Sequence, residues 1–206
     1  MTMEDYFRRA PVIPVLTISR IEHAVPLARA LVSGGLPVLE VTLRTPAALE
    51  ALAVIQREVP EAVVGLGTIL APGDVASALK SGAAFGVSPG LTPELAQAAR
   101  EASLPFLPGV ATASEVMRAR AYGFRHLKFF PAEAAGGRVA VASLSGPFPE
   151  IRFCPTGGIR EETASAWLAL PNVPCVGGSW LAPEHDLEAG AWDKIAARAR
   201  RVSRRW

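Results

Sequence analysis

The sequence predicts an α/β fold, a (β/α)₈ TIM barrel with a short N-terminal helix. Eight short runs rich in β-branched and aromatic residues recur about every 20 residues, and segments with helical spacing lie between them. The 206 residues are fewer than the roughly 250 typical of such barrels, so the loops must be brief. We therefore expect one domain over residues 1–206, and a doubly wound sheet is the alternative fold.

The expected strands are apolar runs bounded by turn residues; they cover 12–17, 37–43, 62–67, 84–88, 105–108, 125–130, 151–154 and 173–177. The expected helices cover 2–9, 22–33, 46–59, 72–81, 93–102, 114–122 and 161–170. Pro46, Pro72 and Pro93 are each expected at a first helical position, where proline is favoured. Thr92 and Ser114 are the expected N-caps.

Charge says little about partners, composition predicts a soluble protein, and nucleic-acid binding by the C-terminal arginines is the alternative to a solvated helix. The net charge is only +2, and no apolar run approaches the roughly 18 residues that span a bilayer. Five arginines between Arg198 and Arg205 are expected to solvate a last helix and to suit the negative end of its dipole. Half of the residues are hydrophobic, which favours an assembly of identical subunits.

The start of the chain and the cysteines predict a cytoplasmic location. The first residues include acids where a signal peptide would carry positive charge. Cys154 and Cys175 lie in separate predicted strands, without the spacing of a metal site or a disulfide framework, and are expected to be buried free thiols.

Lys128 lies in a strand that otherwise consists largely of apolar and aromatic residues. Both faces of such a strand should be covered, so the ammonium group must find a partner or lose its proton. Strand alternation places His126, Lys128 and Phe130 on one face, and Lys128 is expected to point into the barrel. A structural ion pair is the alternative to a catalytic role.

A second strand predicts polar side chains inside the barrel. Its apolar residues should face the helices; they are Leu39, Val41 and Leu43. The alternate residues Glu40, Thr42 and Arg44 then point inward near the carboxyl end of the strand, where the chemistry of these barrels collects. A buried Glu–Arg pair with a purely structural role is the alternative.

Two glycine pairs follow the seventh and eighth predicted strands, within 156–159 and 177–180. Loops at these two positions often bind phosphate, because backbone N–H groups and a helix dipole act on one anion. No dinucleotide or Walker fingerprint is present. The three histidines lack ligand spacing, so no His-rich metal site is expected, while an oxygen-ligated Mg²⁺ stays open.

Taken together, these motifs closely resemble those of the 2-keto-3-deoxy-6-phosphogluconate (KDPG) and 4-hydroxy-2-oxoglutarate (KHG) aldolase family. The matching stretches span nearly the whole chain; they are 39–45, 64–68, 88–92, 128–133, 153–159 and 177–181. The resemblance implies a homotrimeric class I aldolase without a cofactor. It would cleave a keto-acid sugar phosphate, KDPG, to pyruvate and glyceraldehyde 3-phosphate in the Entner–Doudoroff route.

The resemblance also implies roles for the site residues. Lys128 would form a Schiff base with the substrate, and Glu40 would be the general acid/base. The pyruvyl end would be held by Arg44 and Thr68 and walled by Pro89 and Phe130. The residues expected at the phosphate and aldehyde side are Thr156, Gly157, Gly158, Gly178 and Ser179.

Other functions remain open from the sequence. Related aldolases cleave KHG or the galactonate epimer, 6-phospho-2-dehydro-3-deoxygalactonate. A sugar-phosphate isomerase or epimerase would use Lys128 only to neutralise charge. A non-enzymatic barrel would bind phosphorylated metabolites without turnover.

Overall fold

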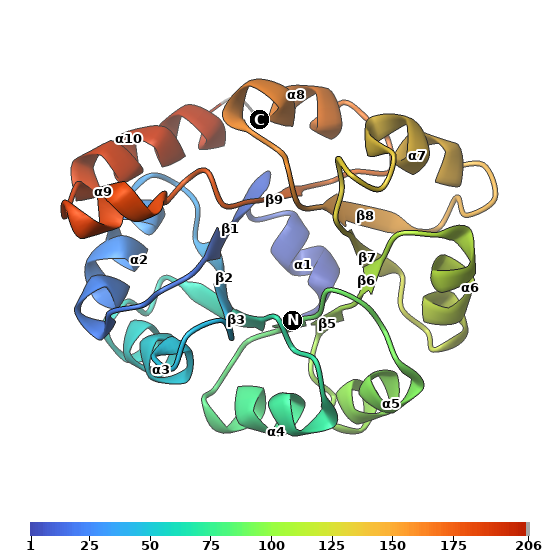
Figure 1. The fold of residues 1–206 in the computed structure, drawn as a ribbon, viewed down its shortest axis with the longest axis horizontal. Helices are drawn as coiled ribbons and strands as arrows, with labels where there is room; N and C mark the ends of the chain where they lie inside the picture. The colour runs from blue at the N-terminus through green and yellow to red at the C-terminus, as the bar shows by residue number, and fades with distance from the viewer. Residues whose placement is uncertain (205–206) are drawn as a thin grey trace.

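The computed structural model describes residues 1–204, which form a ring of parallel strands surrounded by helices (Figure 1). The strands are β1 Val12–Leu16, β2 Val38–Thr42, β3 Val63–Gly67, β4 Gly86–Val87, β5 Phe106–Leu107, β6 Gly109–Val110, β7 His126–Phe129, β8 Arg152–Pro155 and β9 Val176–Gly178. Hydrogen bonding joins them in the orders β5-β4-β3-β2-β1-β9 and β6-β7-β8.

Two contacts close these sheets into a barrel. The N–H of Lys128 in β7 donates to the carbonyl of Pro108, 2.9 Å away, and Thr156 pairs with Gly177 at the end of β8. β5 and β6 together correspond to the strand predicted over 105–108. They are separate strands because Pro108, which lies between them, has no N–H to donate to the ladder. With these two parts taken as one strand, the described chain forms the predicted eight-stranded barrel.

The helices lie outside the ring, except for α1, which lies across its centre in Figure 1. They are α1 Met3–Phe7, α2 Ala24–Ser33 after the 3₁₀ turn η1 Ile21–His23, α3 Ala48–Glu58, α4 Pro72–Lys80, α5 Pro93–Glu101, α6 Ala113–Ala121, α7 Gly137–Leu144, α8 Glu161–Leu168, α9 Glu184–Glu188 and α10 Trp192–Ser203. Among residues 1–204, no helix combines the length and apolarity that a bilayer crossing requires.

Three predictions about helix starts are confirmed and two are wrong. Pro72 and Pro93 begin their helices, and Thr92 caps α5 by accepting a hydrogen bond from the N–H three residues on. The prediction for Pro46 is wrong, because the chain turns first and α3 begins at Ala48. Ser114 is not an N-cap either. The preceding Thr112 takes that place, because it forms a reciprocal capping box with Glu115.

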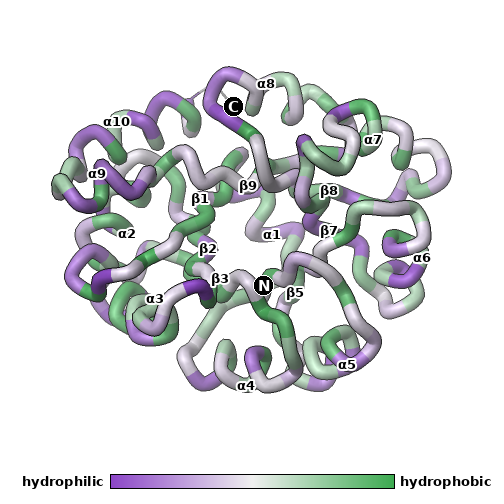
Figure 2. Tube along the Cα trace, in the orientation of Figure 1, coloured by the Kyte–Doolittle hydropathy of each residue, from purple (hydrophilic) through white to green (hydrophobic). Residues whose placement is uncertain are grey.

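Apolar residues are concentrated on the strands and the inner faces of the helices, whereas polar residues occupy the outer faces of the helices (Figure 2). The alternation in β2 has the predicted sense, since Leu39 and Val41 belong to the core around the barrel. Cys154 and Cys175 are buried free thiols, as predicted, and burial is the main cause that raises the pKa of Cys175. The packed shell fixes the strands, and therefore fixes the direction of the side chains inside the ring.

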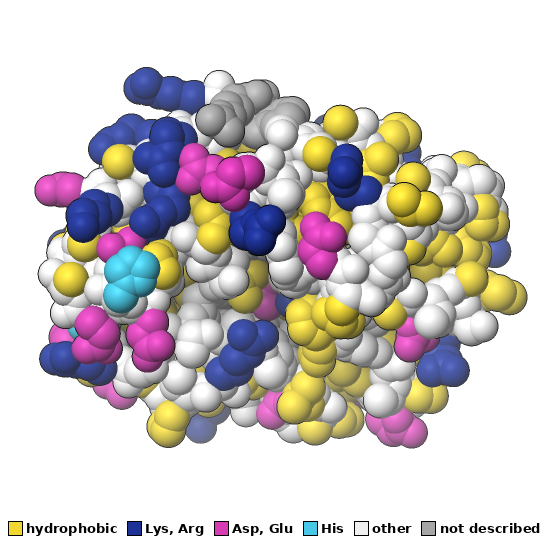
Figure 3. All heavy atoms as spheres, turned by 45° about the horizontal axis from the view of Figure 1, so that its top comes forward, with side chains coloured by type: hydrophobic (Ala, Val, Ile, Leu, Met, Phe, Trp, Pro, Cys, Tyr) yellow, Lys and Arg dark blue, Asp and Glu magenta, His cyan; other side chains and the backbone are white. Residues whose placement is uncertain are grey.

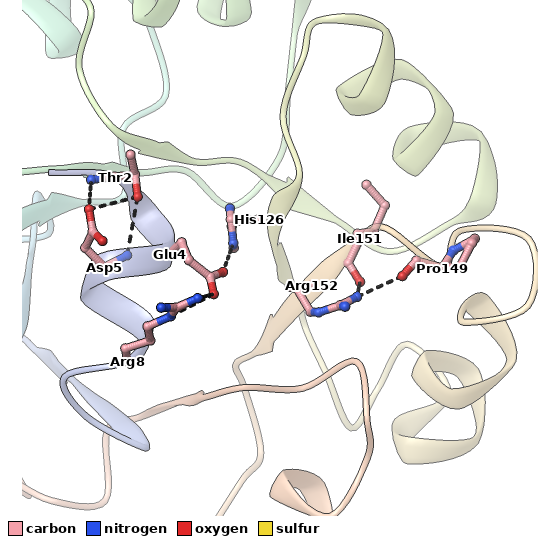
Figure 4. A network of polar contacts seen from close by, with 8 residues as sticks. All are labelled: Thr2, Glu4, Asp5, Arg8, His126, Pro149, Ile151 and Arg152. Carbon is pink, nitrogen blue, oxygen red and sulfur yellow. Dashed lines mark hydrogen bonds and ion pairs between the residues drawn. The ribbon is translucent and has the colours of Figure 1, made fainter.

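Helix α1 covers the amino ends of the strands. The Tyr6 hydroxyl donates to the carbonyl of Ala84 at 3.2 Å, and the Phe7 ring packs edge-on against His126 with centroids 5.2 Å apart. The Glu4 carboxylate lies between the His126 ring, 2.6 Å from one oxygen, and the Arg8 guanidinium (Figure 4). A polar contact and an aromatic contact thus tie α1 to the strand that carries Lys128.

The contact of Glu4 with His126 predicts a pH-dependent stability. The hydrogen bond from His126, followed by that from Arg8, lowers the pKa of Glu4 below its usual 4.5. A lowered carboxyl pKa stabilises the fold above the unfolded value and loses that effect as the pH falls through the folded value. Glu4→Gln should therefore lower Tm at pH 7 by about 1–3 °C, as expected for a half-exposed pair, and by less at pH 3.

Differential scanning calorimetry at the two pH values measures this difference. Glu58→Gln is the matched control, because the Glu58 side chain is similarly exposed, at 44% against 41%, and pairs with the neighbouring Arg57. We expect little change in the Tm of this control. An equal loss of Tm for Glu4→Gln at pH 7 and pH 3 would contradict the proposed linkage.

Candidate active site

Lys128 and Glu40 meet inside the barrel. The Lys128 Nζ of β7 donates to the Glu40 Oε1 of β2 at 3.1 Å, and the two side chains are only 5% and 4% exposed. Both groups are thus withdrawn from water, and each is the other's partner. The structure places them on the inward faces that the strand alternation predicts.

Neighbouring residues shape the space around this pair. A side chain at Gly67 of β3 would overlap the Glu40 carboxylate, so a glycine is required there for the carboxylate to lie beside Lys128. The Lys128 Nζ lies 5.3 Å from the centre of the Phe130 ring, within the range of a cation–π contact. Phe130 is half-buried.

Thr42 and Arg44, the other two polar residues predicted to point inward from this strand, do not lie in the same surroundings as Glu40. The Thr42 hydroxyl donates to the carbonyl of Leu16 at 2.9 Å, so Thr42 ties β2 to β1. Arg44 is not part of the strand: β2 ends at Thr42 and Arg44 lies in the following turn, so the alternation of the strand does not determine its direction. Its side chain is exposed and has no ion-pair partner among the described residues.

Thr68 and Pro89 follow β3 and β4 at the same end of the barrel. Thr68 has a φ of +60°, a conformation that is rare for a β-branched residue and that costs free energy. Pro89 is half-buried, and a side chain at Gly109 would overlap its carbonyl. Gly109 therefore allows the loop after β4 to approach β6, and both Thr68 and Pro89 are held in half-buried positions.

The glycine loops after β8 and β9 offer unpaired backbone donors. Gly157 and Gly158 have φ values of +104° and +80°, which favour glycine. The N–H groups of Gly157, Gly158 and Ser179 donate to no group within residues 1–204. Such N–H groups are suited to an anion.

The two glycine loops lie beside each other. Thr156 is buried, pairs with Gly177, and leaves no room for a side chain there. Gly178 is covered by the Trp180 ring, which a side chain at that position would overlap. Ser179 is exposed and lines a cavity of about 140 Å³ with residues of the loop after β1 and of α9.

The histidines occupy three separate surroundings. His126 contacts Glu4, His23 packs against Trp192 with ring centres 5.7 Å apart, and the exposed His185 lies 3.4 Å from Asp186. No group of three or more His, Cys, Asp or Glu side chains placed to hold a metal occurs in the described chain.

Two features of this region escaped the sequence reasoning. The sequence predicts no role for Gly67, although a glycine inside a strand indicates close approach of another group. The ion pair between Asp186 and Arg198 was also missed, because Arg198 was grouped with the solvent-facing arginines. Apolar residues lie three and four positions from Arg198 along α10, and this spacing indicates only weakly that the arginine is buried.

The chain is similar to aldolases over nearly its whole length. The family model described as "Aldolase: KDPG and KHG aldolase" matches residues 3–198. The 2-dehydro-3-deoxy-phosphogluconate aldolase of Pseudoalteromonas atlantica is 48% identical, covering 98% of this chain and 94% of the relative. The KHG/KDPG aldolase of Escherichia coli K12 is 51% identical, covering 96% and 92%.

Solved structures agree with this family. KDPG aldolase from Legionella pneumophila, with pyruvate captured as a covalent carbinolamine intermediate, is 45% identical, has a TM-score of 0.97 and covers 98% of both chains. The Zymomonas mobilis enzyme with 3-phosphoglycerate is 48% identical with a TM-score of 0.92, covering 98% and 94%. The chain therefore belongs to the KDPG and KHG aldolase family.

Proposed function

We propose that this protein is a class I aldolase that cleaves KDPG to pyruvate and glyceraldehyde 3-phosphate, with Lys128 as the Schiff-base residue. The observation that carries this proposal is the buried contact of 3.1 Å between the Lys128 Nζ and the Glu40 carboxylate. It provides a nucleophile and a proton acceptor within hydrogen-bond distance, the pairing that covalent catalysis requires. Pyruvate release from KDPG, coupled to NADH oxidation by lactate dehydrogenase, tests the activity.

The first step is attack by the Lys128 amine on the C2 carbonyl of the substrate. Only the unprotonated amine is nucleophilic, and the Glu40 Oε1 lies close enough to accept its proton. Addition gives a carbinolamine. Glu40 then returns the proton to the departing hydroxyl, so that loss of water leaves a protonated imine and restores the carboxylate. The carbinolamine of the Legionella relative is the corresponding intermediate with pyruvate.

Cleavage of the C3–C4 bond follows from the imine. The protonated imine withdraws the bond's electron pair into an enamine, so no free carbanion forms. The proton of the C4 hydroxyl must leave at the same time, and Glu40, directly or through one water, is the base that we assign to it. The aldehyde then departs, and protonation of the enamine and hydrolysis release pyruvate.

We assign the pyruvyl end to residues around this pair. The exposed guanidinium of Arg44 can hold the substrate carboxylate bidentately, and Thr68 would add a hydrogen bond. Pro89 and Phe130 would wall the methylene side. Holding the carboxylate in this way orients C2 toward the amine, which lowers the entropic part of the barrier.

The phosphate is assigned to Gly157, Gly158 and Ser179, with Gly178 shaping the second loop and Thr156 facing the aldehyde portion. This assignment is supported by the free N–H groups of the two loops. The presence of 3-phosphoglycerate with the Zymomonas relative supports a phosphorylated three-carbon product. Binding at this remote end supplies free energy that can orient the reacting end.

Replacing Ser179 with alanine tests the phosphate assignment. It should raise KM for KDPG about tenfold, the effect of losing one hydrogen bond to a charged group, with little change for unphosphorylated KHG. Steady-state kinetics on both substrates measures the contrast. Equal increases in KM for KDPG and KHG would rule out the assigned role of Ser179.

Cleavage of KHG is the second candidate activity, because the Escherichia coli relative carries both names. KHG has no phosphate, so it would use Lys128, Glu40 and Arg44 without the glycine loops. Activity on the galactonate epimer would depend on contacts near Thr156.

The homotrimer and the cytoplasmic location remain predictions, and exposed apolar side chains such as Leu70 and Val139 support an assembly.

A further inference from the structure

One arginine of α10 departs from the solvent-facing pattern of its neighbours. Lys and Arg side chains gather over α10 on the upper left of Figure 3, and Arg200, Arg201 and Arg204 are exposed. Arg205 lies outside the described residues. Arg198 is half-buried and reaches inward, so its role cannot be solvation alone.

The Arg198 guanidinium binds two acceptors from different segments. Its Nη1 donates to the carbonyl of Leu181 at 2.8 Å, and its Nη2 donates to the Asp186 Oδ2 at 2.7 Å. Leu181 belongs to the loop after β9, and Asp186 belongs to α9. The fork of an arginine can hold two acceptors in fixed relative positions, which makes this contact a brace between α10, α9 and that loop.

Asp186 makes the brace rigid. Its side chain is only 4% exposed, and burying a carboxylate is costly unless a cation and hydrogen bonds compensate it. The hydrogen bond from Arg198 is the main cause that lowers the pKa of Asp186, which keeps this carboxyl charged. The charges of Arg198 and Asp186 balance each other, so the brace fixes geometry without adding net positive charge.

The loop that receives this brace is the one that carries Ser179. Other polar support is weak, because the hydrogen bond from the Ala182 N–H to the Ser179 carbonyl is 3.4 Å long and the Trp180 Nε1 is buried without a partner in residues 1–204. The Leu181 side chain is fully buried, which anchors the loop without fixing the direction of its backbone. The hydrogen bond of 2.8 Å from Arg198 to the Leu181 carbonyl is therefore the shorter polar contact of this loop.

We propose that Arg198, held by Asp186, is a positioning residue for substrate phosphate. It fixes the backbone at Leu181 and thereby orients the hydroxyl and N–H of Ser179. This inference rests on the phosphate assignment made under the proposed function. Because the phosphate is remote from the reacting carbon, loss of the brace should weaken binding of phosphorylated substrate and leave imine formation at Lys128 intact.

The test compares Arg198→Met with the unmodified enzyme in two measurements. Arg198→Met removes both hydrogen bonds and keeps the apolar stem. KM for KDPG should rise about five- to tenfold with kcat within about twofold, whereas the pyruvate concentration that half-saturates borohydride trapping should not change. Arg198→Lys should have an intermediate KM, because one ammonium cannot reproduce the fork.

Arg120→Met is the control for losing an arginine–carboxylate contact elsewhere, since Arg120 belongs to α6, which lies across the ring from α10 in Figure 1, and pairs with Glu150. It should leave both measurements unchanged. If Arg198→Met does not fold, Asp186→Asn provides the second variant. Its KM should change in the same direction by a smaller factor, because asparagine keeps the size and one acceptor.

The double variant Ser179→Ala with Arg198→Met separates the two proposals. An increase in KM smaller than the product of the two single effects supports action through Ser179, because the alanine variant keeps only the N–H for the brace to orient, whereas fully multiplied effects contradict it. If Ser179→Ala leaves KM for KDPG unchanged, the phosphate assignment itself fails. Suppose that Ser179→Ala raises KM for KDPG. The positioning role of Arg198 is then overturned, and the phosphate assignment stands, if Arg198→Met leaves that KM unchanged or if Arg198→Met weakens pyruvate binding as much as KDPG binding.

Discussion

Replacing Lys128 with methionine is expected to abolish aldol cleavage and to prevent trapping of pyruvate by borohydride. Methionine keeps the apolar stem but has no nucleophile, so neither imine nor enamine can form. The loss should be on the order of 10⁴-fold or more, a large share of the 10⁶-fold or greater acceleration that enzymes provide. The coupled assay for pyruvate, run at enzyme concentrations that reveal residual activity, measures it.

The folded state of this variant must be checked, because it leaves the Glu40 carboxylate buried without its cation. Adding Glu40→Gln to Lys128→Met removes that charge and should restore part of any lost Tm without restoring activity. Lys80→Met is the matched control, since Lys80 is exposed at the end of α4. Turnover by folded Lys128→Met above 1% of the original rate would refute the covalent route.

Replacing Glu40 with glutamine should have the second largest effect. Glutamine preserves the size of the side chain but cannot accept the proton of the C4 hydroxyl, so kcat for KDPG should fall by roughly 10²–10⁴. KM should change much less, because the residues proposed to hold the substrate's carboxylate and phosphate do not include Glu40. Steady-state kinetics gives kcat and KM, and trapping with pyruvate should still label Lys128, at a lower rate.

Glu50→Gln is the control for this variant, because Glu50 lies exposed on α3, the helix that follows the strand of Glu40. It should retain full activity. A decrease in kcat of less than about tenfold for Glu40→Gln would show that another group or solvent carries the proton.

The positions of Lys128 and Glu40 could be predicted because strands buried on both faces have a strict period of two. Once Lys128 and Glu40 are assigned to strands, the side on which each points is determined, and the closed ring brings inward side chains together. The glycine pairs could be placed for a similar reason. In parallel barrels the carboxyl ends of all strands lie at one end, so loops after neighbouring strands must meet.

Arg44 was harder to place because its position depends on where pairing stops. The ladder between β2 and β3 ends at Thr42 and Gly67, after which the backbone turns and the period of two no longer applies. Helix α7 was missed for a local reason. It begins at Gly137 after the N-cap Gly136, both of which have positive φ, and it lacks a side-chain cap.

The Arg198 brace depends on tertiary contacts that no local pattern contains. Its acceptors, Leu181 and Asp186, come from other segments of the chain, and nothing in the sequence distinguishes Arg198 from the four arginines that follow it. The strained φ of Thr68 is equally invisible, because threonine is normally found in extended backbone. Such features follow from the packed fold as a whole.

The assignment of Lys128 as the nucleophile is tested by mass spectrometry of the intact protein after incubation with pyruvate and borohydride. We expect one reduced pyruvyl adduct per chain, and peptide mapping should place it on Lys128. Absence of an adduct on folded protein that cleaves KDPG, or an adduct on Lys80 or Lys194 in place of Lys128, would show that Lys128 is not the nucleophile.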